Sequence, residues 1–368
     1  MKGTFAHLLL EWYRQNGRQL PWRETTDPYA IWLSEIILQQ TRIEQGRPYW
    51  ERFMRRWPRV EDLAAASEDE VLREWQGLGY YSRARNLLFA ARQVVAMGHF
   101  PDTFEEIRKL KGVGDYTAAA IASFAFGISA VVVDGNVYRV LARYFGIDTP
   151  INTTEGKKVF TTMANEVAAE PLSVYNQAIM DFGALQCTPQ SPRCLECPLV
   201  ESCEASRSGR VGQLPVKLRK LKVRERRLTY LYIRYKDASG QTFIAVHRRS
   251  AADIWKGLWE PVLLEDDGTE LFPHDTISLF KQRSVKLFGD VKHVLTHRVI
   301  LADFYLMETN ERPSLPPDYQ WIAEQDFDDT VSPALSILTS LKGSHRLVKW
   351  HKKREMAFFM IFYILGKA

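Results

Sequence analysis

The sequence Leu110-Lys111-Gly112-Val113-Gly114-Asp115-Tyr116-Thr117-Ala118 is a glycine-containing turn between a short predicted helix and a clear one over Thr117–Phe126. Its two glycines allow the backbone to approach a ligand closely, and the N-terminus of the second helix directs free N–H groups at an anion. The turn therefore predicts a phosphate-binding hairpin, with a plain helix–turn–helix corner as the alternative. It lacks the Gly-Lys-Ser/Thr of a P-loop and the preceding strand of a dinucleotide-binding fingerprint.

Around this turn, residues 1–203 are predicted to be almost entirely helical. Asp27-Pro28 supplies a cap and a first-turn proline for a helix with apolar residues over Ile31–Leu38. Ser67–Glu70 reads as a capping box, and residues 82–97 have the periodicity of an amphipathic helix. Helices joined by short turns indicate a globular all-α region.

The pattern changes after Cys203. Between Arg210 and Arg227 there are eight basic residues and one acidic residue, and we predict a basic linker over residues 204–227 that suits a polyanionic partner. Beyond it, short β-branched and aromatic runs predict an α+β domain over residues 228–345, followed by a basic and apolar tail at 346–368. The expected strands are Leu228–Tyr235, Gln241–His247, Trp259–Leu264 and Val299–Leu306, and the expected helix is Pro333–Leu341. Lys236–Gly240, between the first two strands, predicts a β-hairpin.

The whole chain has 368 residues, a formal net charge of +5 and 46% hydrophobic residues. At roughly 150 residues per domain, this length predicts two or three domains with cores of their own. No apolar run reaches the roughly 18 residues that a bilayer span needs. Because Met1–Leu10 has no signal-peptide pattern, we expect a cytoplasmic protein of the bacterial cytosol or nucleoid with no membrane partner.

All four cysteines lie in one loop, with the spacing Cys187-x6-Cys194-x2-Cys197-x5-Cys203, interrupted by prolines. Four soft thiolates this close together predict a metal centre and not a disulfide framework. Zinc and a [4Fe–4S] cluster both accept four thiolates, although zinc more often uses two Cys-x2-Cys pairs. A closed four-ligand site of this kind is expected to stabilise the fold, while a redox role stays open.

Two acidic residues have unusual surroundings. Asp134 follows the apolar run Val131–Val133 just ahead of a predicted helix, and Glu35 lies in the apolar segment Ile31–Leu38. A helix N-cap and an exposed glutamate are the ordinary explanations. Taken together, a desolvated acid and a hydrogen-bonded carboxylate are what cleavage of a glycosidic bond requires. A phosphate-binding hairpin and a basic linker then favour a sugar that belongs to nucleic acid.

Leu110–Gly114, then Val133-Asp134, then the cysteine loop resemble, in order and spacing, the helix-hairpin-helix DNA glycosylases that hold an iron–sulfur cluster. Within that superfamily, Leu33–Thr41, Leu20–Arg23 and Gly77–Arg83 resemble the adenine glycosylase (MutY) family. The resemblance covers about residues 4–205 and, less strongly, the rest. It implies a six-helix barrel at about residues 23–133, a cluster domain from about 1–22 and 134–203, and a [4Fe–4S] cluster on the four cysteines.

The resemblance also implies the reaction: adenine opposite 8-oxoguanine or guanine in duplex DNA is flipped out and its bond to deoxyribose is hydrolysed. Glu35 would protonate the adenine and help activate water, while Asp134, supported by Asn136 and Tyr116, would stabilise the sugar cation. Related lyases have a lysine where this chain has Tyr116, so base removal without efficient strand cleavage is predicted.

Further substrate-binding residues are implied by the same likeness. The adenine pocket would include Arg18, Trp22, Leu38 and Gln177, while Gln40 and Tyr80 would enter the base stack. Lys111 would contact a phosphate. The complete predicted set is Arg18, Leu20, Trp22, Arg23, Leu38, Gln40, Thr41, Tyr80, Lys111, Gly112, Val113, Gly114 and Gln177, with Thr296 and His297 from the second domain. A monomer is expected, with the linker as a candidate contact for other repair proteins.

The second domain resembles the lesion-reading, Nudix-like domain of the same family. Trp255–Glu260 matches a shared strand motif, but the glutamate-rich metal-binding helix of a Nudix hydrolase does not follow it. We therefore expect this domain to bind without hydrolysing. In the loop His293–His297, Thr296 and His297 keep hydrogen-bonding groups, whereas Leu295 replaces an aromatic residue of the family. An ordinary exposed hairpin is the alternative for this loop.

Two rival functions remain from the sequence. One is a bifunctional lyase on oxidised pyrimidines, against which Tyr116 and the second domain argue. The other is a catalytically silent DNA-binding or electron-transfer protein, against which the presence of both Glu35 and Asp134 argues.

Overall fold

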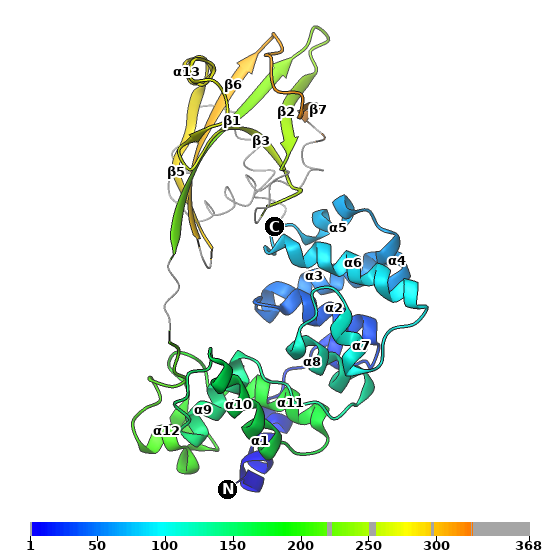
Figure 1. Cartoon of the computed structure of the whole chain (residues 1–368), viewed down its shortest axis with the longest axis vertical. Helices are drawn as coiled ribbons and strands as arrows, with labels where there is room; N and C mark the ends of the chain where they lie inside the picture. The colour runs from blue at the N-terminus through cyan, green and yellow to red at the C-terminus, as the bar shows by residue number, and fades with distance from the viewer. Residues whose placement is uncertain (1, 219–222, 250–254, 296–297, 325, 327–368) are drawn as a thin grey trace. The chain divides into compact units, whose positions relative to one another are not determined.

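The computed structural model describes residues 2–218, 223–249, 255–295, 298–324 and 326. It divides the chain into two compact units, one formed by Met1–Ser67 and Arg83–Lys220, the other by Glu68–Ser82 and Leu221–Ala368. Helices dominate the first unit and a sheet dominates the second, as the sequence predicts (Figure 1). In the described ranges, no helix combines the length and the apolar character needed to cross a membrane.

The predicted all-α region is present from residue 2 to residue 207. Asp27 caps its helix as expected, because its carboxylate accepts from the Tyr29 N–H at 3.0 Å. The helices are α1 (Lys2–Asn16), α2 (Pro28–Leu38), α3 (Ile43–Arg56), α4 (Val60–Ala65), α5 (Glu68–Trp75), α6 (Tyr81–Met97), α7 (Phe104–Lys109), α8 (Asp115–Phe126), α9 (Gly135–Phe145), α10 (Thr154–Val167), α11 (Leu172–Asp181) and α12 (Glu204–Arg207).

One hydrophobic core joins the start of the chain to α9, α10 and α11. Phe5 and Leu9 of α1 are fully buried there against residues such as Leu141 and Phe160. Three of the cysteines also pack on this core. The core therefore holds the end of α1 close to α11 although the two are more than 150 residues apart, as hydrogen bonds between them confirm.

A second packing contact joins α2 to α8, the helix that follows the hairpin (Figure 1). Both helices are apolar on nearly every side, which is typical of helices buried within a domain. Gln39, at the end of α2, donates to the Thr117 hydroxyl at 3.2 Å. This contact brings Glu35 of α2 to the first turn of α8, which carries Tyr116.

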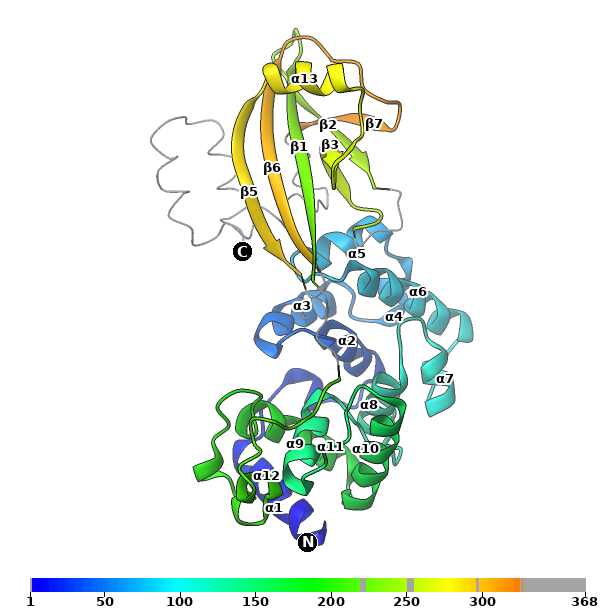
Figure 2. The same cartoon turned by 60° about the vertical axis from the view of Figure 1, so that its left-hand side comes forward.

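The second unit contains a curled sheet in the order β4-β3-β2-β1-β6-β5, with β7 paired to β2 (Figures 1 and 2). β1 and β6 are parallel, and the other pairs are antiparallel. The elements are β1 (Arg224–Lys236), β2 (Thr242–Arg248), β3 (Trp259–Asp266), β4 (Thr269–Glu270), α13 (His274–Gln282), β5 (Val285–Val294), β6 (Arg298–Thr309) and β7 (Tyr319–Ala323). Ile277 and Phe280 of α13 pack on a core that includes Leu231 and Val262 of the sheet.

The predicted hairpin is confirmed, since Tyr235 of β1 pairs with Phe243 of β2. Five features differ from the expectations. β1 begins at Arg224, inside the segment predicted as linker, because β6 pairs with it from that residue onward. In addition, β4, β5, β7 and α13 occupy segments for which no element was predicted. The predicted helix Pro333–Leu341 and the tail 346–368 lie outside the described residues.

Candidate active site

A cleft of about 910 Å³ opens in the helical unit where α2, the start of α8, the start of α9 and α11 converge. Its volume is in the range of sites that hold a small ligand. Thirteen of the residues predicted from sequence line it: Arg18, Leu20, Trp22, Arg23, Glu35, Leu38, Gln40, Thr41, Gly114, Tyr116, Asp134, Asn136 and Gln177. The cleft therefore brings together both predicted catalytic acids and most of the predicted adenine pocket.

Glu35 has the environment expected of a general acid. Burial raises the pKa of its carboxyl to about 7, a hydrogen bond with Tyr116 and the charge of Arg23 oppose the shift, and the charge of Asp134 adds to it. Burial likewise raises the pKa of the Tyr116 phenol well above its ordinary value, so Tyr116 keeps its proton and can donate it. At neutral pH a large fraction of Glu35 is thus protonated, and the acid faces the cleft.

Asp134 has a different environment, because the first turn of α9 surrounds it with donors. Its Oδ1 accepts from the backbone N–H groups of Asn136 and Val137, each at 2.8 Å, and its Oδ2 accepts from the Asn136 side chain at 2.7 Å. Burial raises the pKa of Asp134, but these bonds act against that rise because they favour the charged form. Asp134 is therefore the N-cap of α9, and three hydrogen bonds stabilise the charged form of its carboxylate.

Arg139, which the sequence did not single out, connects this cap to the cysteine loop. Its guanidinium donates to Asn136 Oδ1 at 2.8 Å, to the Gly183 carbonyl at 2.6 Å and to the Cys187 carbonyl at 2.7 Å. Gly183 lies in a π-helical turn, Phe182–Gln186, where a Cβ would come within 2.6 Å of the Asn136 Cβ. Glycine is therefore required for α9 to approach this turn.

The cysteine loop has the donor set of a soft-metal site. Cys187, Cys194, Cys197 and Cys203 are all free and half-buried. Burial, together with the charges of the other three thiols, raises the pKa of Cys197 to about 12, so the four sulfurs influence one another electrostatically. Arg143 holds the loop through the carbonyls of Thr188 at 2.7 Å and Pro189 at 3.1 Å. The donors suit an iron–sulfur cluster, although no group in the described residues is arranged to hold a single metal ion.

A buried carboxylate, Asp181, holds two arginines that line the cleft. Its side chain is fully buried, and it accepts from the guanidinium groups of Arg18 and Arg23, which both line the cleft. Burial acts to raise the pKa of Asp181, but the bonds from the two arginines hold it below the ordinary value. Asp181 could not be identified from sequence, because its two partners Arg18 and Arg23 precede it by 163 and 158 positions.

The hairpin residues lie beside the cleft. Lys111 N–H donates to Gln93 and Val113 N–H donates to Leu110, whereas the N–H groups of Gly112 and Gly114 have no partner among the described residues. Gly112 has a φ of +82°, and a Cβ there would lie 3.0 Å from that of Asn86 in α6, so the tight turn needs glycine. These two free amides, one in the turn and one at the N-cap of α8, are consistent with a phosphate contact.

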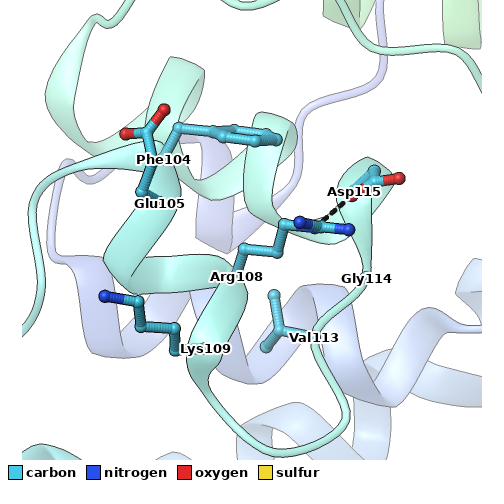
Figure 3. Close-up of a pocket in the computed structure, with 7 residues that line it drawn as sticks. All are labelled: Phe104, Glu105, Arg108, Lys109, Val113, Gly114 and Asp115. Carbon is cyan, nitrogen blue, oxygen red and sulfur yellow. Dashed lines mark ion pairs between the residues drawn. The ribbon is translucent and has the colours of Figure 1, made fainter.

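A second hollow of about 600 Å³ lies against the same hairpin (Figure 3). Figure 3 shows Arg108 and Asp115 facing each other as an ion pair, while Lys109 points away from them. The residues that line it are Phe104, Glu105, Arg108, Lys109, Val113, Gly114 and Asp115. Their two acidic and two basic side chains balance, so this hollow has no net charge to attract an anion.

Gln40 and Tyr80, the predicted stack-entering residues, both have a left-handed backbone, with φ values of 55° and 50°. Such strain in residues other than glycine is common at functional sites. The turn at Gln40 is held by the buried guanidinium of Arg83, which donates to the Gln39 carbonyl at 2.5 Å and the Thr41 hydroxyl at 3.3 Å. Tyr80 lies in the segment Glu68–Ser82, which belongs to the second unit. Thr296 and His297 lie outside the described residues.

In the sheet unit, the motif Trp255–Glu260 ends in a sealed ionic group. Glu260 is 1% exposed, accepts from the Tyr230 hydroxyl at 2.9 Å and pairs with Arg249 at 2.5 Å. Glu260 therefore has a structural role in the interior of the sheet unit. Within the described part of this unit, no group of acids that could hold a metal ion is found.

Comparisons with known proteins agree with this division. Residues 33–163 match the family model "HhH-GPD superfamily base excision DNA repair protein", and residues 229–336 match the NUDIX domain. The chain is 32% identical to the adenine DNA glycosylase of Mus musculus over 93% of this chain and 78% of the mouse protein. It is 33% identical to that of Buchnera aphidicola subsp. Baizongia pistaciae (strain Bp), over 80% of this chain and 83% of the relative. A solved thermostable thymine-DNA glycosylase aligns with a TM-score of 0.52 and 31% identity, over 56% of this chain and 97% of that one.

Proposed function

The chain belongs to the adenine DNA glycosylase family, and on that premise we propose that it removes adenine paired with 8-oxoguanine or guanine in duplex DNA without efficiently cleaving the strand. The observation that carries the proposal is that one cleft presents two carboxyl groups with different hydrogen-bonding environments. Glu35 holds its proton to about pH 7, and Asp134 is bound by three donors that favour its charged form.

The environments of Glu35 and Asp134 assign a catalytic role to each carboxyl group. Glu35 protonates the flipped adenine at a ring nitrogen, which makes the base a better leaving group. As the bond to the sugar breaks, Asp134 stabilises the positive charge that develops on the deoxyribose. Asn136 holds Asp134 in place, and Tyr116, whose hydroxyl donates to Met180 Sδ at 3.6 Å, acts on the Glu35 carboxyl and lowers its pKa. Once the base has left, Glu35 is the carboxylate that can take a proton from the attacking water.

The proposed absence of efficient strand cleavage rests on the residues that line the cleft. A lyase needs an amine that can form a Schiff base with the sugar. Tyr116 stands at the first turn of α8, where the related lyases have a lysine, and no lysine is among the described residues that line the cleft. An abasic site in an intact strand is the expected product.

We further propose that Cys187, Cys194, Cys197 and Cys203 hold a [4Fe–4S] cluster. Such a centre contributes folding energy by closing the loop that carries its thiolates. In this chain, Arg139 and Arg143 connect that loop to α9, so the loop also supports the helix that begins at Asp134. The cysteine loop therefore contributes to the reaction by holding Asp134 in position.

The protein is proposed to act as a cytoplasmic monomer. The sheet unit is proposed to read the base opposite the adenine, through the loop that contains Thr296 and His297. Support for a binding role comes from Glu260, which is sealed by Arg249 and Tyr230 and cannot serve a metal site.

The proposal is tested with four duplexes that carry A opposite 8-oxoguanine, guanine, thymine or cytosine. Base release is scored as strand breaks with and without alkali. We expect breaks only after alkali, fastest for 8-oxoguanine, slower for guanine and minimal for thymine. Breaks without alkali would mean a lyase, and equal rates on all four duplexes would contradict reading of the opposite base.

A further inference from the structure

The wall of the cleft that carries Arg18, Arg23 and Gln177 is held by a chain of hydrogen bonds that starts at Asp181. Asp181 accepts from Arg23 Nη1 at 2.8 Å and from Arg23 Nη2 at 2.9 Å, which fixes the plane of that guanidinium. Arg18 adds three more donations, from its backbone and its side chain. Every polar hydrogen of this group originates on an arginine, because guanidinium groups only donate.

The next member of the chain is Tyr13, at the end of α1. Arg23 Nη1 faces the Tyr13 hydroxyl oxygen at 3.4 Å, and that hydroxyl donates to Gln177 Oε1 at 2.8 Å. Burial raises the pKa of Tyr13, so its hydrogen is retained at neutral pH. An arginine cannot accept this hydrogen, so the hydroxyl must give it to the acceptor end of the Gln177 amide.

The amide of Gln177 therefore has only one orientation that satisfies Tyr13. Its oxygen is turned toward Tyr13, and its NH₂ group is left for the cleft, whose lining includes Gln177. The side chain at this position thus acts as a donor toward a bound base, as do the two arginines beside it.

We propose that Tyr13, oriented by Arg23 and Asp181, is a specificity-determining positioning residue that fixes Gln177 as a hydrogen-bond donor to the Watson–Crick edge of the flipped base. This inference rests on the proposed adenine glycosylase function and deepens it. This chain of hydrogen bonds from Asp181 through Arg23 and Tyr13 to Gln177, here called the relay, selects purines whose ring N1 is an acceptor, as in adenine. It rejects purines whose N1 carries a hydrogen, as in hypoxanthine and guanine, because two donors would then face each other in a desolvated site.

The test compares release of adenine and of hypoxanthine opposite 8-oxoguanine, by wild type and by Tyr13→Phe. The phenylalanine keeps the ring but frees the amide to rotate, so its oxygen can turn to the cleft. We expect the adenine-to-hypoxanthine ratio of kcat/KM to fall about tenfold, a change typical for loss of one oriented hydrogen bond. Tyr175→Phe is the matched control, because the Tyr175 hydroxyl is buried without a hydrogen-bond partner in the described structure. Its ratio should match that of wild type.

Two further variants separate the relay from a general packing effect. Gln177→Met removes the donor and should lower the same ratio by itself, and adding Tyr13→Phe in that background should change the ratio no further. If Tyr13→Phe does not fold, an unchanged ratio in Gln177→Met overturns the relay. If Tyr13→Phe folds and slows both bases equally, the residue is merely structural and the inference is wrong.

The failure of this inference is distinguishable from failure of the proposed function. Wild type that releases adenine while the Tyr13→Phe ratio stays unchanged refutes only the relay. Wild type that releases no adenine from any mispair refutes the proposed function itself and, with it, the inference that depends on it.

Discussion

Each unit of this protein holds a desolvated glutamate beside a tyrosine, and the two glutamates differ in their other contacts. Glu35 of the helical unit contacts Tyr116, faces a cleft and has a pKa raised to about 7. Glu260 of the sheet unit contacts Tyr230, is 1% exposed and is paired with Arg249 at 2.5 Å.

The difference shows what turns a buried carboxyl group into a catalyst. The charge of Glu260 is balanced by the buried guanidinium of Arg249, so Glu260 contributes to the fold. Glu35 forms no ion pair with any residue that the structure describes, is influenced by the charges of Arg23 and Asp134, and opens to space for a substrate. Both glutamates are desolvated, so the catalytic role of Glu35 must come from its open cleft and from the lack of an ion pair with any described residue.

Replacing Glu35 with Gln is the change with the largest expected effect on activity. The variant cannot donate a proton, so single-turnover adenine release should fall by about 10³-fold or more. Its thermal stability should equal or exceed that of wild type, because a desolvated carboxyl is removed. Release that stays within tenfold of wild type would show that another group is the acid.

Glu260→Gln should show the opposite pattern. It removes the closer of the two carboxylates that pair with the buried Arg249 guanidinium and leaves Asp266 at 3.8 Å, and loss of one partner of a buried ion pair costs up to about 3–5 kcal/mol. We expect a large drop in the urea or thermal midpoint of the sheet unit, while the rate of adenine release at guanine mispairs stays within about threefold for folded protein. A stable variant would break the comparison between the two glutamates.

The raised pKa of Glu35 predicts how both the reaction rate and the stability depend on pH. Since Glu35 acts as a protonated acid with a pKa of about 7, the single-turnover rate should be level below pH 7 and fall about tenfold per unit above it. Its pKa is higher in the folded state than in the unfolded chain, so the folded state binds more protons. The stability that this group contributes is present below the unfolded pKa of about 4.3 and is lost as pH rises to 7.

Glu35→Gln should remove that part of the stability profile. Denaturation measured between pH 4.5 and pH 8 should be flatter for the variant than for wild type. A rate profile that rises through pH 7 would instead indicate a base that must lose a proton.

The smallest expected effects come from the two tyrosines. Tyr116→Phe removes a bond that lowers the pKa of Glu35, so the alkaline limb of the rate profile should shift upward, with a loss of rate of about tenfold or less. Tyr230→Phe leaves Glu260 paired with Arg249 and should cost about 1 kcal/mol with no change in the rate profile. An identical profile for Tyr116→Phe would mean that the phenol does not act on Glu35.

Local signals predicted the parts of the molecule that local chemistry forms. Asp27-Pro28 marked the start of α2, and the apolar run before Asp134 marked the cap of α9. The ordinary and the functional explanations of Asp134 are both consistent with its geometry, because a residue that caps a helix is also held by donors. The hairpin between β1 and β2 followed from its turn residues.

Features that depend on distant partners could not be predicted in this way. Asp181 becomes a buried anion only because α1 and α11 share a core with Arg18 nearby. β5 lacks regular alternation, since its register shifts twice and Asp290 has a φ of 52°. Its pairing with β6, and the parallel pairing of β6 with β1, join segments that no turn signal connects.

The most direct test of the central claim is single-turnover adenine release from a duplex with A opposite 8-oxoguanine, by wild type and by Asp134→Asn. The asparagine keeps the shape of the cap and can still accept from the backbone of α9, so the fold and DNA binding should remain. The account predicts release by wild type and at least a hundredfold loss in the variant with unchanged affinity for the duplex. Release by Asp134→Asn at the wild-type rate would contradict it.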